Sequence, residues 1–234
     1  MRRGLVPSRT AAQEAIASGR ILVSGSVASK PAHMVAASEP IELTGLPRRY
    51  VSRGGCKLEA ALDEFRIDVT GLRCLDVGAS TGGFTDCLLQ HGAAHVVAVD
   101  VGRGQLDWSM RTDERVTPVE ETDVRDVDAS TVGEVDLVVA DVSFISLRTV
   151  LPSIAALADG APIIALVKPQ FEVGRTRVGK GGIVRDPSLH VDAVRSVVAR
   201  AHELALRCVA TVPSPIEGAE GNREFFVQLI RMGR

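Results

Sequence analysis

The segment 73–101 constrains the fold of this chain more than any other part of its sequence. It contains an apolar run, a glycine-rich turn at 78–83, a helix-like stretch and a second apolar run. Short apolar runs bounded by glycine are typical of parallel strands that are covered on both faces. The segment therefore predicts one βαβ unit, whose glycines let the first turn bend sharply and lie close to a ligand.

The glycine spacing and two aspartates indicate which ligand the turn would hold. A dinucleotide site needs Gly-x-Gly-x-x-Gly, whereas this turn reads Gly-x-x-x-Gly-Gly. Asp76 closes the first strand and can accept hydrogen bonds from the ammonium group of an amino acid. Asp100 closes the second strand and can accept hydrogen bonds from ribose hydroxyls. An amino acid joined to a nucleoside is S-adenosylmethionine. The pair therefore favours that cofactor over a βα turn that binds no ligand.

The sequence beyond the βαβ unit continues to alternate strand and helix. Further strands are expected at 116–119, 135–140, 162–167, 208–212 and 224–230, and helices at 147–157 and 188–206. This order, which ends in strand, loop and strand, is that of a doubly wound, Rossmann-like α/β methyltransferase with an antiparallel last strand. Asp123 follows the third strand and is expected to accept a hydrogen bond from an adenine amino group. The expected cofactor contacts are Asp76, Gly78, Ala79, Ser80, Thr81, Gly82, Gly83, Phe84, Asp100, Asp123 and Asp141.

A small basic α+β unit precedes this domain. Residues 8–19 read as an amphipathic helix, 21–27 as two strands joined by a tight turn, and 41–43 as another short strand. Residues 1–57 hold nine Lys or Arg and three acidic residues, a net charge of +6; because the whole chain carries −2, the remainder carries −8. A basic unit on an acidic enzyme is expected to bind a polyanion, and a solvated basic surface is the alternative.

Composition and spacing set further limits. A connector with proline and arginine separates the two parts, which places the basic unit at 1–46, a linker at 47–53 and the catalytic domain at 54–234. No segment reads as membrane-spanning and no signal peptide opens the sequence, so a cytoplasmic protein that does not bind membranes is expected. The cysteines and histidines lack metal-ligand spacing, which predicts no metal site.

Four charged residues are expected to meet at one edge of the sheet. Ligands of open α/β sheets lie beyond the carboxyl ends of the parallel strands, where Asp141 and Lys168 stand. An antiparallel last strand begins at that same edge with Glu224, and Lys57 can reach over it from the helix before the first strand. A surface ion pair is the alternative for any one of these residues, but four at one edge favour a catalytic site.

Five motifs extend along the chain: Tyr50-Val-Ser-Arg-Gly-Gly-Cys-Lys57, Leu75-Asp-Val-Gly-Ala-Ser-Thr-Gly-Gly-Phe84, Ala140-Asp-Val-Ser-Phe144, Leu166-Val-Lys-Pro-Gln-Phe-Glu172 and Gly221-Asn-Arg-Glu-Phe-Phe226. Together they resemble the TlyA, or haemolysin A, family of ribosomal RNA 2'-O-methyltransferases, within the wider FtsJ-like group. The resemblance implies a Lys-Asp-Lys-Glu tetrad at Lys57, Asp141, Lys168 and Glu224, and methylation of cytidine ribose in 16S or 23S ribosomal RNA. The basic unit resembles an S4 RNA-binding domain shortened at its start, which implies docking on ribosomal RNA or ribosomal subunits.

The residue types agree with that chemistry. A ribose hydroxyl is a poor nucleophile, so the enzyme must align it with the activated methyl group and stabilise the developing alkoxide. Lys168 is expected beside the 2'-oxygen, and the sequence leaves open whether it acts as a neutral base or as a cation.

Basic residues outside the tetrad are expected to bind RNA. The glycine-rich loop at 172–185 reads as a lid that clasps phosphates, with a mobile solvent loop as the alternative. Phe144 is a candidate to stack on a base, with ordinary packing as the alternative. The expected RNA contacts are Arg2, Arg3, Arg9, Arg20, Lys30, Arg53, Arg175, Arg177, Lys180 and Arg185.

Other functions stay open at this point. An exocyclic-amine methyltransferase would carry prolines where the chain has Val142 and Ser143, and a cytosine C5 enzyme would need a cysteine at this edge. A pore-forming haemolysin is suggested by the family's second name, although the chain has few aromatic residues. An RNA-binding assembly factor with an inactive methyltransferase fold would not need the complete tetrad.

Overall fold

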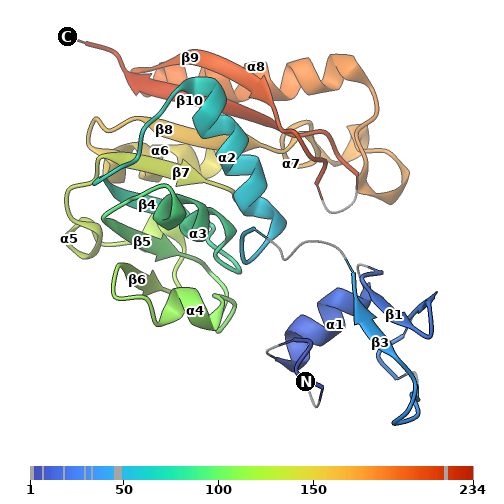
Figure 1. The fold of residues 1–234 in the computed structure, drawn as a ribbon. Coiled ribbons are helices and arrows are strands. Elements are labelled where there is room, and N and C mark those ends of the chain that lie inside the picture. The colour runs from blue at the N-terminus through green and yellow to red at the C-terminus, as the bar shows by residue number, and fades with distance from the viewer. Residues whose placement is uncertain are drawn as a thin grey trace. The chain divides into compact units, whose positions relative to one another are not determined.

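The computed structural model describes residues 3–6, 8–17, 19–28, 30–32, 34–44, 49–218 and 221–233. The chain divides into two compact units, Met1–Arg48 and Arg49–Arg234 (Figure 1). No helix in the described ranges is long and apolar enough to cross a bilayer.

The smaller unit is one helix beside a three-stranded antiparallel sheet. The helix is α1 (Arg9–Ala17), and the strands are β1 (Ile21–Val23), β2 (Ser26–Val27) and β3 (Ile41–Leu43), in the order β2-β1-β3. The hydroxyl of Ser8 accepts a hydrogen bond from the Ala11 amide at 3.1 Å, which caps the helix. The turn between β1 and β2 holds two residues with positive φ, as a tight hairpin requires. The predicted helix and hairpin are thus confirmed, over a small core of Ala15, Ile21, Val23 and Ala28.

The larger unit alternates strands and helices. Its strands are β4 (Arg73–Val77), β5 (His95–Val99), β6 (Val116–Val119), β7 (Leu137–Ala140), β8 (Ile163–Val167), β9 (Leu206–Pro213) and β10 (Phe225–Arg231). The α-helices are α2 (Arg53–Phe65), α3 (Gly83–Gln90), α4 (Trp108–Arg111), α5 (Ala129–Val132), α6 (Leu147–Ala158), α7 (Pro169–Glu172) and α8 (Pro187–Glu203). Short 3₁₀ turns lie at η1 (Val124–Asp126), η2 (Arg175–Arg177) and η3 (Lys180–Gly182).

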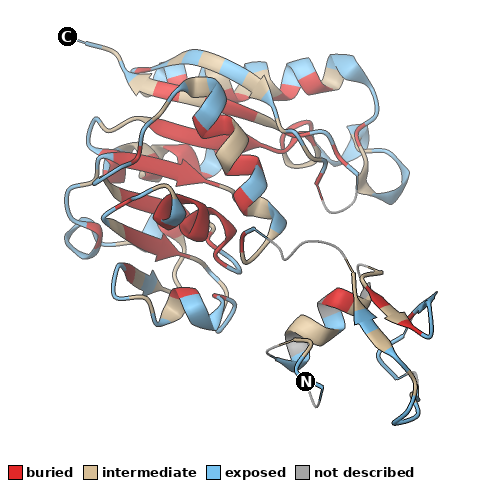
Figure 2. Cartoon of the chain, in the orientation of Figure 1, coloured by how far each residue is buried: buried red, intermediate tan, exposed pale blue. Residues whose placement is uncertain are grey.

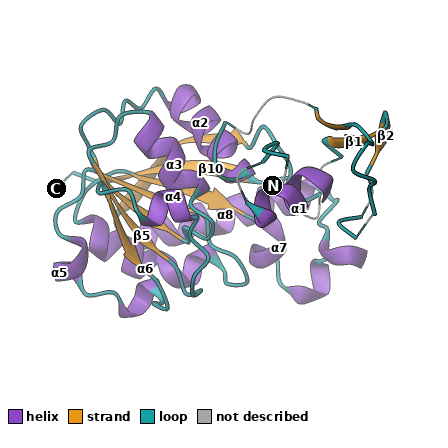
Figure 3. Ribbon diagram, turned by 60° about the horizontal axis from the view of Figure 1, so that its bottom comes forward, coloured by secondary structure: helices purple, strands orange, loops and turns teal. Residues whose placement is uncertain are grey.

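The seven strands form one sheet in the order β6-β5-β4-β7-β8-β10-β9. The pairs from β6 to β8 are parallel, whereas β10 is antiparallel to both β8 and β9. Helices lie on both faces of the sheet (Figure 3). This arrangement confirms the predicted doubly wound α/β fold and its antiparallel last strand.

Apolar side chains fill the space on each face of the sheet. Because neighbouring residues of a strand point to opposite faces, Leu75 packs in the cluster that includes α6 and α8, while Cys74 packs in the cluster that includes α2 and α3. The central strands are buried along most of their length (Figure 2). This double cover explains why their sequences are continuous apolar runs rather than alternating patterns.

The strand directions bring distant parts of the chain to one edge. Strands β4, β7 and β8 end at this edge, and β10 begins there because it runs the opposite way. The register fixes the match, since Phe225 at the start of β10 pairs with Val167 at the end of β8. The residues just outside these ends are Asp141, Lys168 and Glu224.

Candidate active site

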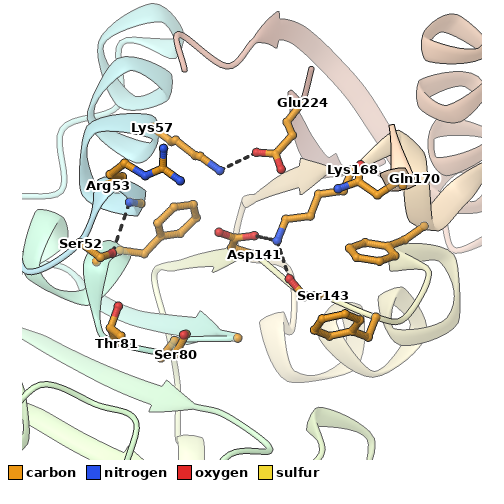
Figure 4. Close-up of a pocket in the computed structure, with 18 of the residues that line it drawn as sticks. Ser52, Arg53, Lys57, Ser80, Thr81, Asp141, Ser143, Lys168, Gln170 and Glu224 are labelled. Carbon is orange, nitrogen blue, oxygen red and sulfur yellow. Dashed lines mark hydrogen bonds and ion pairs between the residues drawn. The ribbon is translucent and has the colours of Figure 1, made fainter. Parts of the chain in front are cut away.

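Four charged side chains form two ion pairs at the carboxyl edge of the sheet. The Nζ atom of Lys57 lies 2.5 Å from Oε2 of Glu224, and the Nζ atom of Lys168 lies 2.5 Å from Oδ1 of Asp141. The two lysines extend toward each other from opposite walls of one cavity (Figure 4). Lys57, Lys168 and Glu224 are all less than 10% exposed. The structure therefore brings together the four residues that the sequence predicts.

Local structure fixes the first ion pair. Helix α2 begins at Ser52, whose hydroxyl accepts a hydrogen bond from the Gly54 amide, and Lys57 lies on the buried face of that helix. Glu224 packs against Gly218, where an added Cβ would lie 2.5 Å from its Oε1 atom. A larger residue at 218 would require the Glu224 carboxylate to move.

Local structure also fixes the second ion pair. Lys168 directly follows β8 and Asp141 directly follows β7, so the pair joins the ends of two adjacent parallel strands. Lys168 also donates a hydrogen bond to Oγ of Ser143 at 2.7 Å. The ammonium group is therefore held by two residues of the same loop.

The cavity around these residues has a volume of about 840 Å³. Its walls come from the start of α2, the glycine turn after β4, the loops after β7 and β8, and the loop that precedes α8. It is lined by Ser52, Arg53, Gly54, Lys57, Gly78, Ala79, Ser80, Thr81, Gly83, Phe84, Asp141, Ser143, Phe144, Lys168, Gln170, Phe171, Arg175, Val178, Gly179, Gly182 and Glu224.

A second cavity of about 270 Å³ lies on the other side of the glycine turn. Five residues line both cavities, so the two adjoin: Gly78, Ser80, Asp141, Ser143 and Phe144. The smaller cavity has apolar walls from Val99, Val101, Val124, Val142 and Ile145, and it holds the carboxylate of Asp100. Together the cavities offer a polar compartment next to an apolar one.

The first glycine of the turn has a structural requirement that other residues cannot meet. Gly78 has a φ of 83°, and an added Cβ would lie 2.5 Å from the carbonyl oxygen of Asp141. Both the conformation and the close approach of two backbones exclude larger residues at this position.

Most of the predicted cofactor contacts line a cavity. Gly78, Ala79, Ser80, Thr81, Gly83, Phe84 and Asp141 line the larger one, and Asp100 and Asp123 are among those that line the smaller one. The Asp100 carboxylate accepts hydrogen bonds from the amides of Ser80 at 2.8 Å and Gly102 at 2.7 Å. Asp123 is bonded through both oxygens to Arg125, which lowers the pKa of its carboxyl group. Gly82 is buried at the start of α3 and lines neither of these two cavities.

Asp76 lies near the end of β4, as predicted, and its side chain is buried there. Its side chain is fully buried and lines neither cavity, and its Oδ2 atom accepts a hydrogen bond from the Thr85 hydroxyl at 2.6 Å. Its Oδ1 atom has no hydrogen-bond partner among the described residues. Burial raises the pKa of this carboxyl group to about 7, against the effect of the Thr85 hydrogen bond. The direct contact of Asp76 with a ligand ammonium stays a prediction, and in this structure the carboxylate is bonded to Thr85 of helix α3.

The predicted RNA contacts fall into two groups by their surroundings. In the larger unit Arg53 and Arg175 line the cavity, Lys180 and Arg185 are exposed, and Arg177 lies 3.4 Å from the carboxylate of Asp192.

In the smaller unit, two of the predicted RNA contacts are used to hold the fold. Arg3 donates hydrogen bonds to backbone carbonyls, including that of Ala36 at 2.9 Å, and Arg20 donates to the Thr44 carbonyl at 3.1 Å. Arg9 and Lys30 are exposed, and Arg2 lies outside the described residues.

The loop between α7 and α8 contains regular turns and bonds to buried side chains. It forms two 3₁₀ turns, and two buried side chains outside it bond to its backbone. Asn222 and His190 supply these bonds, and the sequence did not single out either of them. The cavity wall also includes residues that the sequence does not predict, among them Ser52, Ser143, Gln170 and Phe171.

The described residues contain no group of three or more His, Cys, Asp or Glu side chains placed to hold a metal ion.

Comparisons with known proteins agree with this geometry. Residues 50–231 match the model of the FtsJ-like methyltransferase family, and residues 2–41 match that of the S4 domain. The chain is 51% identical to the 16S/23S rRNA (cytidine-2'-O)-methyltransferase TlyA of Mycobacterium tuberculosis, covering 98% of this chain and 87% of that protein. It is 40% identical to hemolysin A of Brachyspira hyodysenteriae, covering 97% and 95% of the two chains. A solved hemolysin candidate from Streptococcus thermophilus is 41% identical, with a TM-score of 0.79 over 99% of this chain and 86% of that one.

Proposed function

This chain belongs to the FtsJ-like methyltransferase family, and from that premise we propose that it methylates a cytidine 2'-hydroxyl of ribosomal RNA with S-adenosylmethionine. One observation carries the proposal: Lys57, Asp141, Lys168 and Glu224 converge in a cavity that adjoins the glycine turn. The relatives named as cytidine-2'-O-methyltransferases support the choice of ribose over base.

The residues around the glycine turn fit S-adenosylmethionine. The larger cavity offers polar groups and backbone next to Gly78, while the smaller one offers valine and isoleucine side chains for a flat base. The Asp100 carboxylate stands in the smaller cavity, where it can still accept hydrogen bonds from ribose hydroxyls because each oxygen has two lone pairs. When bound, the cofactor would supply a methyl group that its sulfonium charge already activates.

The chain's own residues account for the remaining requirements of the reaction. A 2'-hydroxyl holds its proton tightly, so methyl transfer needs a positive group beside the oxygen as negative charge develops there, and a base or solvent water to take the proton that the oxygen loses. We assign this role to Lys168, because Asp141 and Ser143 hold its ammonium in one direction within the cavity. Lys57 adds a second cation at the opposite wall, and Glu224 keeps it in place. The four groups are fixed before the substrate arrives, which reduces the cost of aligning them.

The two units divide the binding of RNA. The S4 domain match and the basic composition of the smaller unit support a docking role on ribosomal RNA. Arg53 and Arg175 line the cavity, and we propose that they contact phosphates of the bound RNA.

The experiment that tests this proposal locates the methyl group. Purified protein is incubated with radiolabelled S-adenosylmethionine and separate 30S or 50S subunits from cells that lack the modification, and the RNA is digested to nucleosides. We expect the label in 2'-O-methylcytidine. Label in a methylated base, or no label above that of a boiled-protein control, would contradict the proposal.

A further inference from the structure

We infer that Asn222 is a positioning residue for RNA binding, because it holds the basic loop 174–185 against the wall of the larger cavity. This role depends on the proposed RNA substrate. In it, Asn222 fixes the position of the loop whose basic side chains bind phosphates.

Asn222 bonds to the loop with both ends of its amide. Its Oδ1 atom accepts a hydrogen bond from the Val184 amide at 2.9 Å, and its Nδ2 atom donates one to the Gly182 carbonyl at 2.9 Å. The side chain is only 1% exposed, so these bonds do not compete with water. An amide offers an acceptor and a donor on separate atoms, which lets one side chain bond to two groups of the loop backbone.

His190 provides a third bond to the same part of the loop. Its Nε2 atom lies 2.7 Å from the Val184 carbonyl, and the residue is buried on helix α8. Within the loop, the Gly179 amide donates to the Ile183 carbonyl at 3.1 Å. The loop is thus closed on itself and attached to the domain through two buried side chains.

The loop has the chemistry of a phosphate-binding surface. It carries four basic residues and no acidic one over 174–185. Arg175 and Gly179 line the cavity that holds Lys168, while Lys180 and Arg185 are exposed beside it. Long cations on a fixed backbone lose less freedom on binding than cations on a mobile one, so fixing the loop strengthens RNA binding.

The position of Asn222 in the chain links this loop to the ion pairs. It lies two residues before Glu224, in a turn where the Gly218 amide donates to the Asn222 carbonyl at 2.9 Å. One short segment therefore fixes both a wall of the RNA surface and a carboxylate of the cavity.

The test compares RNA binding with cofactor binding. Asn222→Ala removes both bonds to the loop. Asn222→Asp keeps the acceptor for the Val184 amide and loses the donor to the Gly182 carbonyl when its carboxyl group is ionised. Thr117→Val is the matched control. It removes the hydrogen bond between Thr117 and His95, 2.9 Å long, at the β6 edge of the sheet. Affinity for protein-free ribosomal RNA and for purified subunits is measured over a range of salt concentrations, and affinity for S-adenosylmethionine by calorimetry.

We expect both Asn222 variants to bind RNA on the order of tenfold more weakly and with a shallower salt dependence, since fewer phosphates are neutralised. Cofactor affinity should stay within about twofold of the parent value, as should all constants of Thr117→Val. His190→Ala serves as a second route to the same result if Asn222→Ala fails to fold.

Two outcomes would overturn the inference. One is unchanged RNA affinity and salt dependence in a folded Asn222 variant; the other is joint loss of RNA and cofactor binding in Asn222→Asp and His190→Ala, which would indicate a purely structural role. Neither readout requires methyl transfer, so the inference can fail or stand separately from the assignment of the methyl group to ribose.

Discussion

The ammonium of Lys168 lies 2.5 Å from a carboxylate oxygen of Asp141, across the ends of two adjacent parallel strands. The same ammonium donates to the Ser143 hydroxyl at 2.7 Å. Both partners belong to the loop after β7, so the direction of the lysine is set by backbone that the sheet itself holds in register. A cation fixed in this way can stabilise charge without rearranging during the reaction.

Replacing Lys168 with Met should remove methyl transfer and leave cofactor binding largely intact. The side chain keeps its length but loses the charge, and groups of this kind contribute on the order of 10³-fold to a rate. Methyl incorporation into ribosomal RNA and calorimetric titration with S-adenosylmethionine provide the two measurements. Turnover above about a tenth of the parent rate would remove Lys168 from its assigned role.

The Lys57–Glu224 pair allows stability and activity to be separated. Lys57→Met leaves the carboxylate of Glu224, 3% exposed, without its cation, which should cost about 3–5 kcal/mol of unfolding free energy. Adding Glu224→Gln removes the buried charge and should restore most of that loss, while activity stays low in both variants. Urea unfolding measures the first quantity and methyl incorporation the second. If Lys57→Met were as stable as the parent protein, the ion pair would not be buried from water in the way that the structure indicates.

Gly78→Ala should weaken cofactor binding. The loss of affinity should be larger than the small loss of unfolding free energy can account for. The added Cβ would meet the Asp141 carbonyl oxygen at 2.5 Å and move the turn that separates the two cavities. Gly71→Ala is a matched control, because Gly71 has a similar φ of 75° but no heavy atom within 4 Å of the added Cβ. Both variants should lose about 1–2 kcal/mol from the positive φ. Only Gly78→Ala should lose affinity for S-adenosylmethionine, and equal affinities in the two variants would contradict this reading.

Asp76 should make the protein less stable as the pH rises from about 4 to 7. The pKa of its carboxyl group is raised from the ordinary 3.8 to about 7, chiefly by burial. The folded state therefore keeps a proton that the unfolded state releases in this range, so the stabilisation is complete below the lower pKa and is lost above the higher one. The change amounts to at most about 4 kcal/mol.

Asp76→Asn cannot titrate, and its unfolding free energy should depend less steeply on pH than that of the parent protein. Urea unfolding at half-unit intervals between pH 5 and pH 8 measures both slopes. Parallel curves for the two proteins would mean that Asp76 is ionised in the folded state.

The sequence predicts those parts of the site whose positions depend on strand order alone. Asp141, Lys168 and Glu224 follow or precede strands whose apolar runs are unmistakable, so the edge at which they meet follows from the topology. Lys57 required one further step, since its helix lies outside the sheet and is positioned by packing and by the ion pair with Glu224. Topology thus carries more information about this site than any single motif.

The local surroundings of the side chains could not be predicted from the sequence. Asp76 stands at a strand end as predicted, but Thr85 of the following helix covers its carboxylate. Asp123 lies by the smaller cavity, yet both of its oxygens are bonded to Arg125, two residues away. Periodicity does not reveal such local pairing. Ser143 could have been found, because a residue two positions after Asp141 must lie near the same edge.

The reversed direction of β10 has a consequence for the synthesis of this protein. Lys57 and Glu224 are 167 residues apart, and the ribosome releases the amino-terminal member of the pair first. A nascent chain whose β10 is still inside the exit tunnel has no counter-ion for Lys57 and an open sheet edge next to β8. Both gaps close only when translation has passed β10.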